Sequence, residues 1–214
     1  MIRIVVADDH TIVREGLKQL LGAAGDLEVV GEAQNGHEVI ERIRLLEFDL
    51  LLLDMSMPGK SGIELIKQVR SEKPKLKILV LSMHEEHQYA VRAIRAGAAG
   101  YVTKESATLQ LVEAIRKVAS GGAFISSAVA EQLALGAMPD AQGLPHESLS
   151  DREFQVFRML AEGKSVSDIA ERLTLSVKTV STHKANILHK MSLGSSGDLI
   201  RYAIAHRLVE APED

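Results

Sequence analysis

The first 120 residues alternate between two kinds of hydrophobic pattern, and this alternation restricts the possible folds more than any other feature. Five short segments are apolar throughout, which is typical of strands covered on both faces in a parallel sheet. They are Ile2 to Ala7, Leu27 to Ala33, Leu50 to Leu53, Ile78 to Leu81 and Gly100 to Val102. Each is followed by a helical pattern, at Thr11 to Ala24, Gly36 to Leu46, Gly62 to Glu72, Glu86 to Ala96 and Thr108 to Ser120. We therefore predict that residues 1–122 form a doubly wound α/β domain around a five-stranded parallel sheet.

The rest of the chain divides into a linker and a helical domain. Gly136, Pro139, Gly143 and Pro145 fall within ten residues that have no apolar period, so we assign residues 123–148 to a short helix, Ser126 to Leu135, and a linker. Residues 149–214 contain only helical patterns, which predicts an all-α domain of four helices. Gly163 suits the position after the first helix, and Ser176 suits the N-cap of the third. The helices are expected at Ser150 to Glu162, Val166 to Leu173, Val177 to Lys190 and Ser196 to His206.

Composition excludes several classes of protein. The chain has no cysteine, which excludes disulfides, thiol catalysis, iron–sulfur clusters and zinc fingers that need cysteine. No apolar segment approaches the roughly 20 residues of a membrane helix. The N-terminal sequence MIRIVVADD reaches paired acids before a signal-peptide core could form. Three Tyr and four Phe leave little for a base-stacking platform for single-stranded RNA. We expect a cytoplasmic protein without membrane segments.

Acidic side chains follow two of the predicted strands. Asp8 and Asp9 come directly after the first strand, and Asp54 comes after the third. In the flavodoxin-like strand order 2-1-3-4-5 these two strands are neighbours, so the carboxylates meet at the edge where such sheets bind ligands. Carboxylates this close raise one another's pKa unless a cation compensates. Mg²⁺ prefers oxygen ligands and keeps coordination positions open for a phosphate oxygen, so we predict a Mg²⁺ site here.

The same edge carries further groups that suit phosphoryl transfer to a carboxylate. Ser82 and Lys104 lie at the ends of the fourth and fifth predicted strands and add a hydroxyl and an ammonium group. Asp54 is the candidate nucleophile, because Asp8 and Asp9 are adjacent and can share the metal. Taken singly, each acid has a local alternative: Asp9 could cap the following helix, and Asp54 could begin a turn.

Three nearby features partly match known metal or nucleotide sites, and we do not interpret them as such sites. The histidines of HEEH, His84 and His87, are three residues apart, whereas the zinc-binding pair of HExxH is four apart. The GKSG segment that begins at Gly59 lacks the spacing of a nucleotide-binding P-loop. His10 is interpreted as a surface residue of the first helical turn and not as a metal ligand.

The segments VVADDH, LLLDMSMPGKSGIEL, ILVLSMH and GAAGYVTKES resemble, in order and spacing, the receiver domain of bacterial two-component response regulators. The resemblance covers about residues 2–120 and implies Mg²⁺ as cofactor and a sensor histidine kinase as phosphoryl donor. Pro58 and Gly62 match the turn that follows the phospho-acceptor in this family. The implied roles are phospho-acceptor for Asp54, Mg²⁺ ligands for Asp8, Asp9, Asp54 and the backbone carbonyl of Ser56, switch hydroxyl for Ser82, phosphate contact for Lys104 and switch aromatic for Tyr101.

Charge in the second domain is unevenly distributed. Residues 172–207 carry six basic groups and one acid, a net charge of +5, whereas residues 146–171 carry three basic and six acidic groups, a net charge of −3. A basic stripe is typical of a phosphate-binding surface, although a solvated helix face can look the same. In the third helix we expect an apolar face to meet the core and a small polar face to fit a DNA major groove. The expected core residues are Val177, Val180, Ile187 and Met191.

The sequence from Leu149 to about Leu208 resembles the LuxR-type helix-turn-helix, which together with a receiver domain defines the NarL/FixJ family of response regulators. The resemblance implies binding to duplex DNA as a homodimer. It implies recognition-face roles for Lys178, Thr179, Ser181, Thr182 and Ala185, and phosphate contacts for Lys184 and Lys190. The chain departs from the family pattern at residues 166–168, VSD, and at residues 193–198, LGSSGD.

We therefore expect a transcription regulator, not an enzyme, in which phosphorylation of Asp54 promotes dimerisation and DNA binding. Two alternatives remain open from the sequence. The first is an α/β phosphatase that uses Asp54 or Asp8 as a turnover nucleophile. The second is a protein-interaction adaptor whose last domain no longer binds DNA, which the departures from the family pattern would suit.

Overall fold

In the part of the chain that the computed structural model describes, residues 1–57, 62–82, 87–135, 144–206 and 208–209, five parallel strands form one sheet. The strand order β2-β1-β3-β4-β5 confirms the predicted one. Each strand lies at its predicted segment, and β3, β4 and β5 extend it by one residue at one or both ends. The strands are β1 (Ile2–Ala7), β2 (Leu27–Ala33), β3 (Leu50–Asp54), β4 (Lys77–Ser82) and β5 (Gly100–Thr103).

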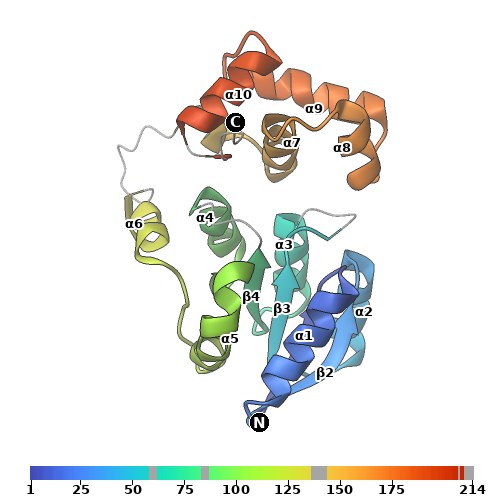
Figure 1. Ribbon diagram of the computed structural model, residues 1–214, viewed down its shortest axis with the longest axis vertical. Helices are drawn as coiled ribbons and strands as arrows, with labels where there is room; N and C mark the ends of the chain where they lie inside the picture. Colours follow the sequence, from blue (N-terminus) through green and yellow to red (C-terminus); the bar gives the residue numbers. More distant parts are fainter. Residues whose placement is uncertain (58–61, 83–86, 136–143, 207, 210–214) are drawn as a thin grey trace. The chain divides into compact units, whose positions relative to one another are not determined.

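Helices lie on both faces of this sheet, as the continuous apolar character of the strands requires (Figure 1). Alternate strand residues such as Ile4, Val6, Leu50 and Leu52 pack with α1 and α5 in one buried cluster, while Val5, Leu51 and Leu53 are buried on the opposite face. The helices up to residue 135 are α1 (Thr11–Gly22), α2 (Gly36–Leu45), α3 (Gly62–Glu72), α4 (His87–Ala96), α5 (Lys104–Ala119) and α6 (Ser127–Leu135).

The free edge of β5 is covered by the backbone that follows α5. The amide of Tyr101 donates to the carbonyl of Phe124 at 2.8 Å, and the amide of Phe124 donates to the carbonyl of Ala99 at 3.1 Å. Gly100 permits this close approach, because a Cβ there would lie 3.0 Å from the Phe124 carbonyl oxygen. The backbone of Tyr101 is thereby tied to the segment that leads towards α6.

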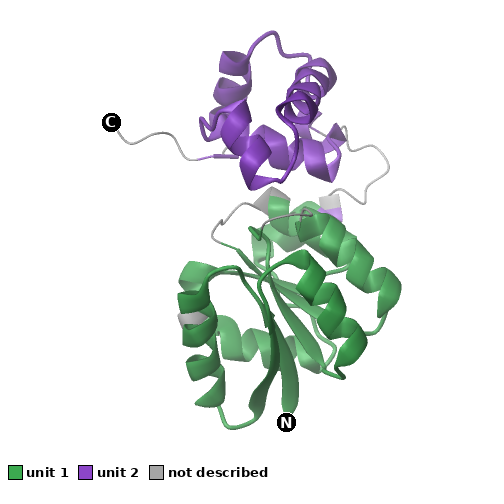
Figure 2. Ribbon diagram, turned by 90° about the vertical axis from the view of Figure 1, so that its right-hand side faces the viewer, with its two compact units in different colours: residues 1–132 green, residues 133–214 purple. Residues whose placement is uncertain are grey.

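The chain divides into two compact units, residues 1–132 and 133–214 (Figure 2). The second unit is helical, which confirms the predicted fold class, and its core includes Phe154, Phe157, Val180, Ile187 and Leu199. Serine side chains cap its helices: Ser150 and Ser165 form capping boxes with Glu153 and Asp168, and Ser176 accepts from the amide of Thr179 as predicted. Its elements are η1 (Pro145–Ser148), α7 (Asp151–Ala161), α8 (Val166–Arg172), α9 (Val177–Lys190) and α10 (Ser196–Ala205).

Three expectations about local structure differ from what is observed. The fifth helix begins at Lys104 and not at Thr108, because the Thr103 side chain accepts from the amide of Ser106 and caps it. Pro145, assigned above to an irregular linker, begins a 3₁₀ turn that buries His146. Val177 does not face the core, since its exposed fraction is 51%. Val177 is the first residue of α9 and lies about 60° from the stripe that Val180 and Ile187 form.

Some predicted features lie wholly or partly outside the described residues: Pro58, the GKSG and HEEH segments, and the glycines and proline of the linker before Leu144. Gly62 is described and begins α3. None of the described helices combines the length with the apolar character that would let it span a membrane.

Candidate functional site

The carboxyl ends of neighbouring strands bring the predicted acids together. Ala7 of β1 pairs with Leu53 of β3, so Asp8 and Asp54, the next residue of each strand, are neighbours at the same edge of the sheet. Both side chains are almost fully buried, with exposed fractions of 0% for Asp8 and 1% for Asp54. Two carboxylates that come from distant parts of the sequence therefore share one water-excluded position, as the strand order predicted.

Lys104 bridges these two carboxylates. Its Nζ donates to Asp8 Oδ2 at 2.6 Å and lies 3.0 Å from Asp54 Oδ2. The residue is the first of α5, whose start is set by the Thr103 cap, and its side chain is only 12% exposed. The helix cap that the sequence did not predict thus fixes where this ammonium group enters the pocket.

Backbone amides hold the remaining carboxylate oxygens. Asp54 Oδ1 accepts from the amide of Ser56 at 3.1 Å, and Asp8 Oδ1 accepts from the amide of His10 at 2.8 Å. These contacts leave one oxygen of each acid on the Lys104 side and one on the loop side. The two carboxylates are thereby held in defined orientations by groups from three separate segments of the chain.

The electrostatics of the pocket are dominated by desolvation. Burial raises the pKa of the Asp54 carboxyl above its ordinary value of 3.8, and the Asp8 carboxylate raises it further, while Lys104 opposes the shift. Burial alone would lower the pKa of Lys104, but its hydrogen bond to Asp8 and the charge of Asp54 outweigh this and raise it. One buried ammonium group faces two buried carboxylates and the nearby Asp9, so the pocket is set up to attract another cation.

Four side chains at this edge could hold that cation. Asp8, Asp9, His10 and Asp54 each offer one ligand atom, and these atoms lie within 4.8 Å of one another. Asp9 Oδ1 is 2.9 Å from His10 Nδ1, and the imidazole is well exposed at the mouth of the site. The three carboxylates supply the oxygen ligands that a hard divalent cation such as Mg²⁺ prefers, so the donor set fits the predicted metal.

The two proposed switch residues share a face of the sheet. Tyr101 of β5 pairs with Val80 of β4, and Ser82 follows two residues later on the same strand. Because side chains alternate along a strand, Tyr101 and Ser82 project from the same face. Both are buried, with exposed fractions of 8% and 1%.

Gly62 is required by packing next to Asp54. A Cβ at this position would lie 2.6 Å from the sulfur of Met55 and 3.0 Å from the Met55 backbone. Since Met55 follows Asp54 directly, the absence of a side chain at the start of α3 allows this helix to lie close to the end of β3. The glycine therefore serves close packing, because its φ is not in the left-handed region.

The predicted DNA-contacting residues lie on the solvent side of α9. Val180 and Ile187 face the core, whereas Lys178, Ser181 and Thr182 are exposed. The set is not uniformly accessible: Thr179 and Lys184 are half-buried, and the Thr179 hydroxyl is hydrogen-bonded to Ser176. The remaining predicted residues, Ala185 and Lys190, are exposed.

One contact in this region was not expected from the sequence. Lys190, predicted as a phosphate contact, lies with its Nζ 2.7 Å from Oε2 of Glu153 on α7. The Glu153 side chain is only 6% exposed and also accepts from the amide of Ser150 as part of a capping box. A buried acid at the start of α7 thus holds the end of α9, and the only signal for it was the Ser150–Glu153 spacing.

Comparisons with known proteins agree with this architecture. Residues 4–116 match the family described as "Response regulator receiver domain", and residues 147–203 match "Bacterial regulatory proteins, luxR family". The chain is 38% identical over 212 residues to the response regulator GacA of Pseudomonas aeruginosa, covering 99% of each chain. It is 37% identical to the response regulator UvrY of Escherichia coli K12, covering 99% of this chain and 97% of that one.

Solved structures give the same result. A structure of RcsB from Salmonella typhimurium superposes with a TM-score of 0.72 and 29% identity, covering 95% of this chain and 97% of that one. Another, of RcsB from Salmonella enterica serovar Typhimurium bound to the promoter rprA with the phosphomimetic BeF₃⁻, has a TM-score of 0.67 and 30% identity over 94% of this chain and 98% of that one.

A doubly wound sheet with buried acids at its carboxyl edge, followed by a helix-turn-helix, defines the class of two-component response regulators. The chain belongs to the NarL/FixJ family of this class, with a receiver domain and a LuxR-family domain. Proteins of this family are DNA-binding transcription regulators that respond to phosphorylation.

Proposed function

We propose that Asp54 accepts a phosphoryl group from a sensor histidine kinase and that this modification promotes dimerisation and binding of α9 to promoter DNA. The observation that carries the proposal is the convergence of Asp8, Asp9 and Asp54 with Lys104 at the carboxyl edge of the sheet. We assign residues 1–122 to the receiver domain, 123–148 to the connecting segment and 149–214 to the DNA-binding domain.

The acid pocket is the proposed Mg²⁺ site. Asp8, Asp9 and Asp54 would hold the ion through carboxylate oxygens, and the backbone carbonyl of Ser56 is the proposed further ligand. When bound, the ion supplies positive charge that neutralises the oxygens of the transferring phosphoryl group. The ion also balances the excess negative charge that Lys104 alone does not compensate.

The chemistry we propose is transfer to a carboxylate. An oxygen of Asp54 attacks phosphorus, the bond between phosphorus and the histidine nitrogen of the kinase breaks, and a mixed anhydride forms on Asp54. Lys104 stays beside the transferred group and pairs with one of its oxygens, as it pairs with Asp54 before the transfer. We assign to Ser82, at the end of the neighbouring strand β4, the donation of its hydroxyl to another oxygen of the phosphoryl group. Tyr101, on the same face of the sheet, is the residue proposed to change its rotamer with Ser82.

DNA binding is assigned to the exposed face of α9. Lys178, Ser181, Thr182 and Ala185 are exposed along this helix. Short side chains let a helix approach base edges in the major groove while lysines reach phosphates, a geometry used by helix-turn-helix proteins. Thr179, Lys184 and Lys190 complete the proposed contact set. The RcsB structures bound to promoter DNA support this assignment by similarity.

Dimerisation would double the number of phosphates that the protein neutralises, which raises affinity and steepens its salt dependence. A homodimer also matches a DNA site with two-fold symmetry. A structure of two RcsB dimers bound to two parallel DNAs supports this expectation by similarity. We place the protein in the bacterial cytoplasm, where promoter DNA and the kinase domain meet.

The decisive experiment treats the chain with a small acyl-phosphate donor and Mg²⁺ and follows both the intact mass and the DNA fragments that the protein selects. We expect one phosphoryl group per chain, bound at Asp54, and stronger selection of a common sequence after phosphorylation. Steady hydrolysis of many phosphoesters per chain would instead support the phosphatase alternative. Failure to bind any duplex, with phosphorylation intact, would support the adaptor alternative.

A further inference from the structure

Arg14 is a buried cation that the proposed phosphoryl chemistry does not use. It lies on α1, one turn after the acidic loop, and its exposed fraction is only 4%. A buried guanidinium is costly unless its charge is paired and its donors are satisfied, so the contacts it makes indicate what it does.

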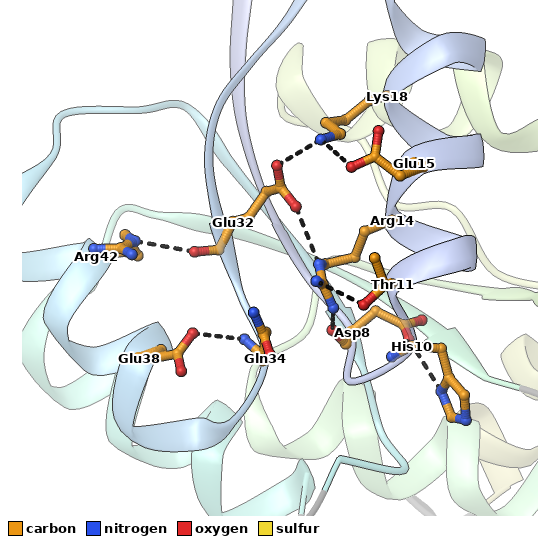
Figure 3. A network of polar contacts seen from close by, with 10 residues as sticks. All are labelled: Asp8, His10, Thr11, Arg14, Glu15, Lys18, Glu32, Gln34, Glu38 and Arg42. Atoms are coloured by element: carbon orange, nitrogen blue, oxygen red, sulfur yellow. Dashed lines mark hydrogen bonds and ion pairs between the residues drawn. The ribbon is translucent and has the colours of Figure 1, made fainter.

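The guanidinium contacts three different segments at once (Figure 3). Its NH1 donates to the backbone carbonyl of Asp8 at 2.8 Å, and its NH2 donates to the hydroxyl of Thr11 at 3.3 Å. Its Nε donates to Oε2 of Glu32, on β2, at 3.0 Å. Arg14 thus joins the loop after β1, the first turn of α1 and the neighbouring strand, directly behind the acidic pocket.

These contacts complete the restraint of Asp8. The Asp8 amide donates to the carbonyl of Ala33 on β2 at 3.1 Å, and its own carbonyl is held by Arg14. Its carboxylate is held by the amide of His10 and by Lys104. Because both ends of the residue are fixed, the direction of its side chain into the pocket is fixed as well, and the adjoining peptide that carries Asp9 is restrained with it.

The charge of Arg14 is compensated away from the pocket. Glu32 accepts from Arg14 with one carboxylate oxygen and from Lys18 with the other, at 2.8 Å. The hydrogen bond from Lys18 is the largest cause that lowers the pKa of Glu32, and Arg14 adds to it against the effect of burial, so Glu32 is ionised at neutral pH. Arg14 therefore meets Asp8 through a neutral carbonyl and does not occupy the carboxylate that the cation needs.

We propose that Arg14 is a positioning residue for the divalent-cation site: by holding the Asp8 carbonyl against β2, it keeps the Asp8 and Asp9 carboxylates converged on Asp54. This inference rests on the proposed function, because it assumes that the acid pocket binds Mg²⁺. Groups that orient metal ligands without touching the metal typically change metal affinity 10- to 100-fold when they are replaced.

The chain offers a matched pair of variants for the test. Arg14→Lys keeps the positive charge but replaces the planar fork by a single ammonium, which cannot reach the Asp8 carbonyl, Thr11 and Glu32 together. Lys18→Met removes the other cation on the same Glu32 carboxylate, four residues along the same helix, without touching Asp8. Both variants disturb the network around Glu32, and only one disturbs the hold on Asp8.

The measurement is the dissociation constant for Mg²⁺ of the full chain, obtained by calorimetric titration, together with the thermal unfolding of each variant. We expect Arg14→Lys to weaken Mg²⁺ binding about 10- to 100-fold, and Lys18→Met to change it by no more than about twofold, because Lys18 makes no contact with Asp8 and a partly exposed ion pair contributes little. Equal Mg²⁺ affinity in Arg14→Lys and the wild type would overturn the proposal, as would an equal loss in both variants.

A second variant keeps the test decisive if Arg14→Lys does not fold. Glu32→Gln retains an acceptor of the same size but leaves the Arg14 charge uncompensated behind the pocket. We expect it to weaken Mg²⁺ binding severalfold, and unchanged binding would count against the role of Arg14. If the wild-type chain itself binds no Mg²⁺, the proposed function fails. If the wild type binds Mg²⁺ and both Arg14→Lys and Glu32→Gln bind it equally well, only the positioning role of Arg14 fails.

Discussion

The two units of this protein use charged side chains in opposite ways. In the first unit Asp8, Asp54 and Lys104 are buried together, and each depends on the others for compensation. In the second unit Glu153 is paired at a helix cap with Lys190, which is 41% exposed, and Lys178 remains on the surface of α9. The Asp8, Asp54 and Lys104 group is sensitive to a change of charge. The Glu153–Lys190 pair instead holds the end of the exposed helix α9 against α7.

The difference follows from what buried charge does to a fold. A buried group of two carboxylates and one ammonium is costly and carries excess negative charge, so a covalent change at one member must be answered by the others. Locally capped helices make no such demand, because the serine caps at their starts bind backbone amides of the same helix. We infer that the first unit is built to change state and the second to keep its shape.

Asp54→Asn is expected to have the largest effect, because it removes the nucleophile while leaving the size of the side chain unchanged. Phosphorylation by a small acyl-phosphate donor should be lost completely, as measured by the intact mass of the protein. Asp26→Asn is the matched control, since Asp26 is an exposed acid that pairs with Arg116 away from the pocket. Labelling retained in Asp54→Asn would assign the nucleophile to another residue.

Phe157→Ala should give the next largest effect and should be confined to the second unit. The ring is fully buried and lies against Phe154 and Tyr202, with centroids 5.9 and 6.4 Å away. Truncation of a buried aromatic costs about 3–5 kcal/mol of stability. Hydrogen–deuterium exchange of individual peptides should speed up in residues 144–206 and leave β1 and β3 unchanged.

Leu79→Ala makes the corresponding test in the first unit, because Leu79 is fully buried in the core of the sheet. It should speed up exchange in the strands and leave α7 and α9 protected. If either variant loosened both units to the same extent, the view that each unit stands on its own core would be wrong.

The Glu153–Lys190 pair should contribute about 1 kcal/mol, with a defined pH dependence. Burial would raise the pKa of Glu153, but the hydrogen bond from Lys190 and the Ser150 cap outweigh it and hold the pKa below the ordinary value of 4.5. A carboxyl whose pKa is lower in the folded chain stabilises it above that ordinary value, and the contribution is lost as the pH falls through the folded-state pKa.

Lys190→Met should therefore be less stable than the wild type at pH 7, and the two should converge in strong acid. Urea unfolding at a series of pH values measures this difference. Glu153→Gln is the companion variant, since glutamine also suits the capping box but does not ionise in this range. In that background Lys190→Met should lose its pH-dependent effect, and a pH dependence that persisted would point to a different acid.

The sequence was sufficient for the features that follow from topology. Parallel strands end at a common edge, so acids placed after the first and third strands had to meet there once the strand order was assumed, and Asp8 and Asp54 do. The strands and most helices were predicted for the same reason, since their apolar patterns reflect which faces are covered. Sequence could also anticipate Ser176 and Gly163, whose roles depend only on the local backbone.

Features that depend on partners distant in the sequence were missed. Arg14 is one basic residue in an amphipathic helix, and its burial becomes reasonable only when Glu32, 18 residues away on β2, is placed beside it. His146 lies among glycines and prolines that indicate a loop, yet its ring packs against Phe154 and bonds to Tyr202, 56 residues away. Val177 was wrongly predicted to face the core because its apolar side chain was counted with the stripe of Val180 and Ile187, from which it lies about 60° away around the helix.

The smallest expected effect is a difference between Lys178 and Lys190, both of which were predicted from the sequence to contact DNA. Lys178 is exposed at the start of α9 and makes no ion pair among the described residues, whereas Lys190 is committed to Glu153. A lysine that contacts a phosphate in the complex reduces the slope of log affinity against log salt concentration by about 0.9 when it is removed. Lys178→Ala should show that full reduction in a fluorescence-anisotropy titration, equally for specific and nonspecific duplexes. Lys190→Ala should show a smaller one, because part of its charge is already neutralised, and equal slopes for the two variants would mean that the Glu153 pair opens when DNA binds.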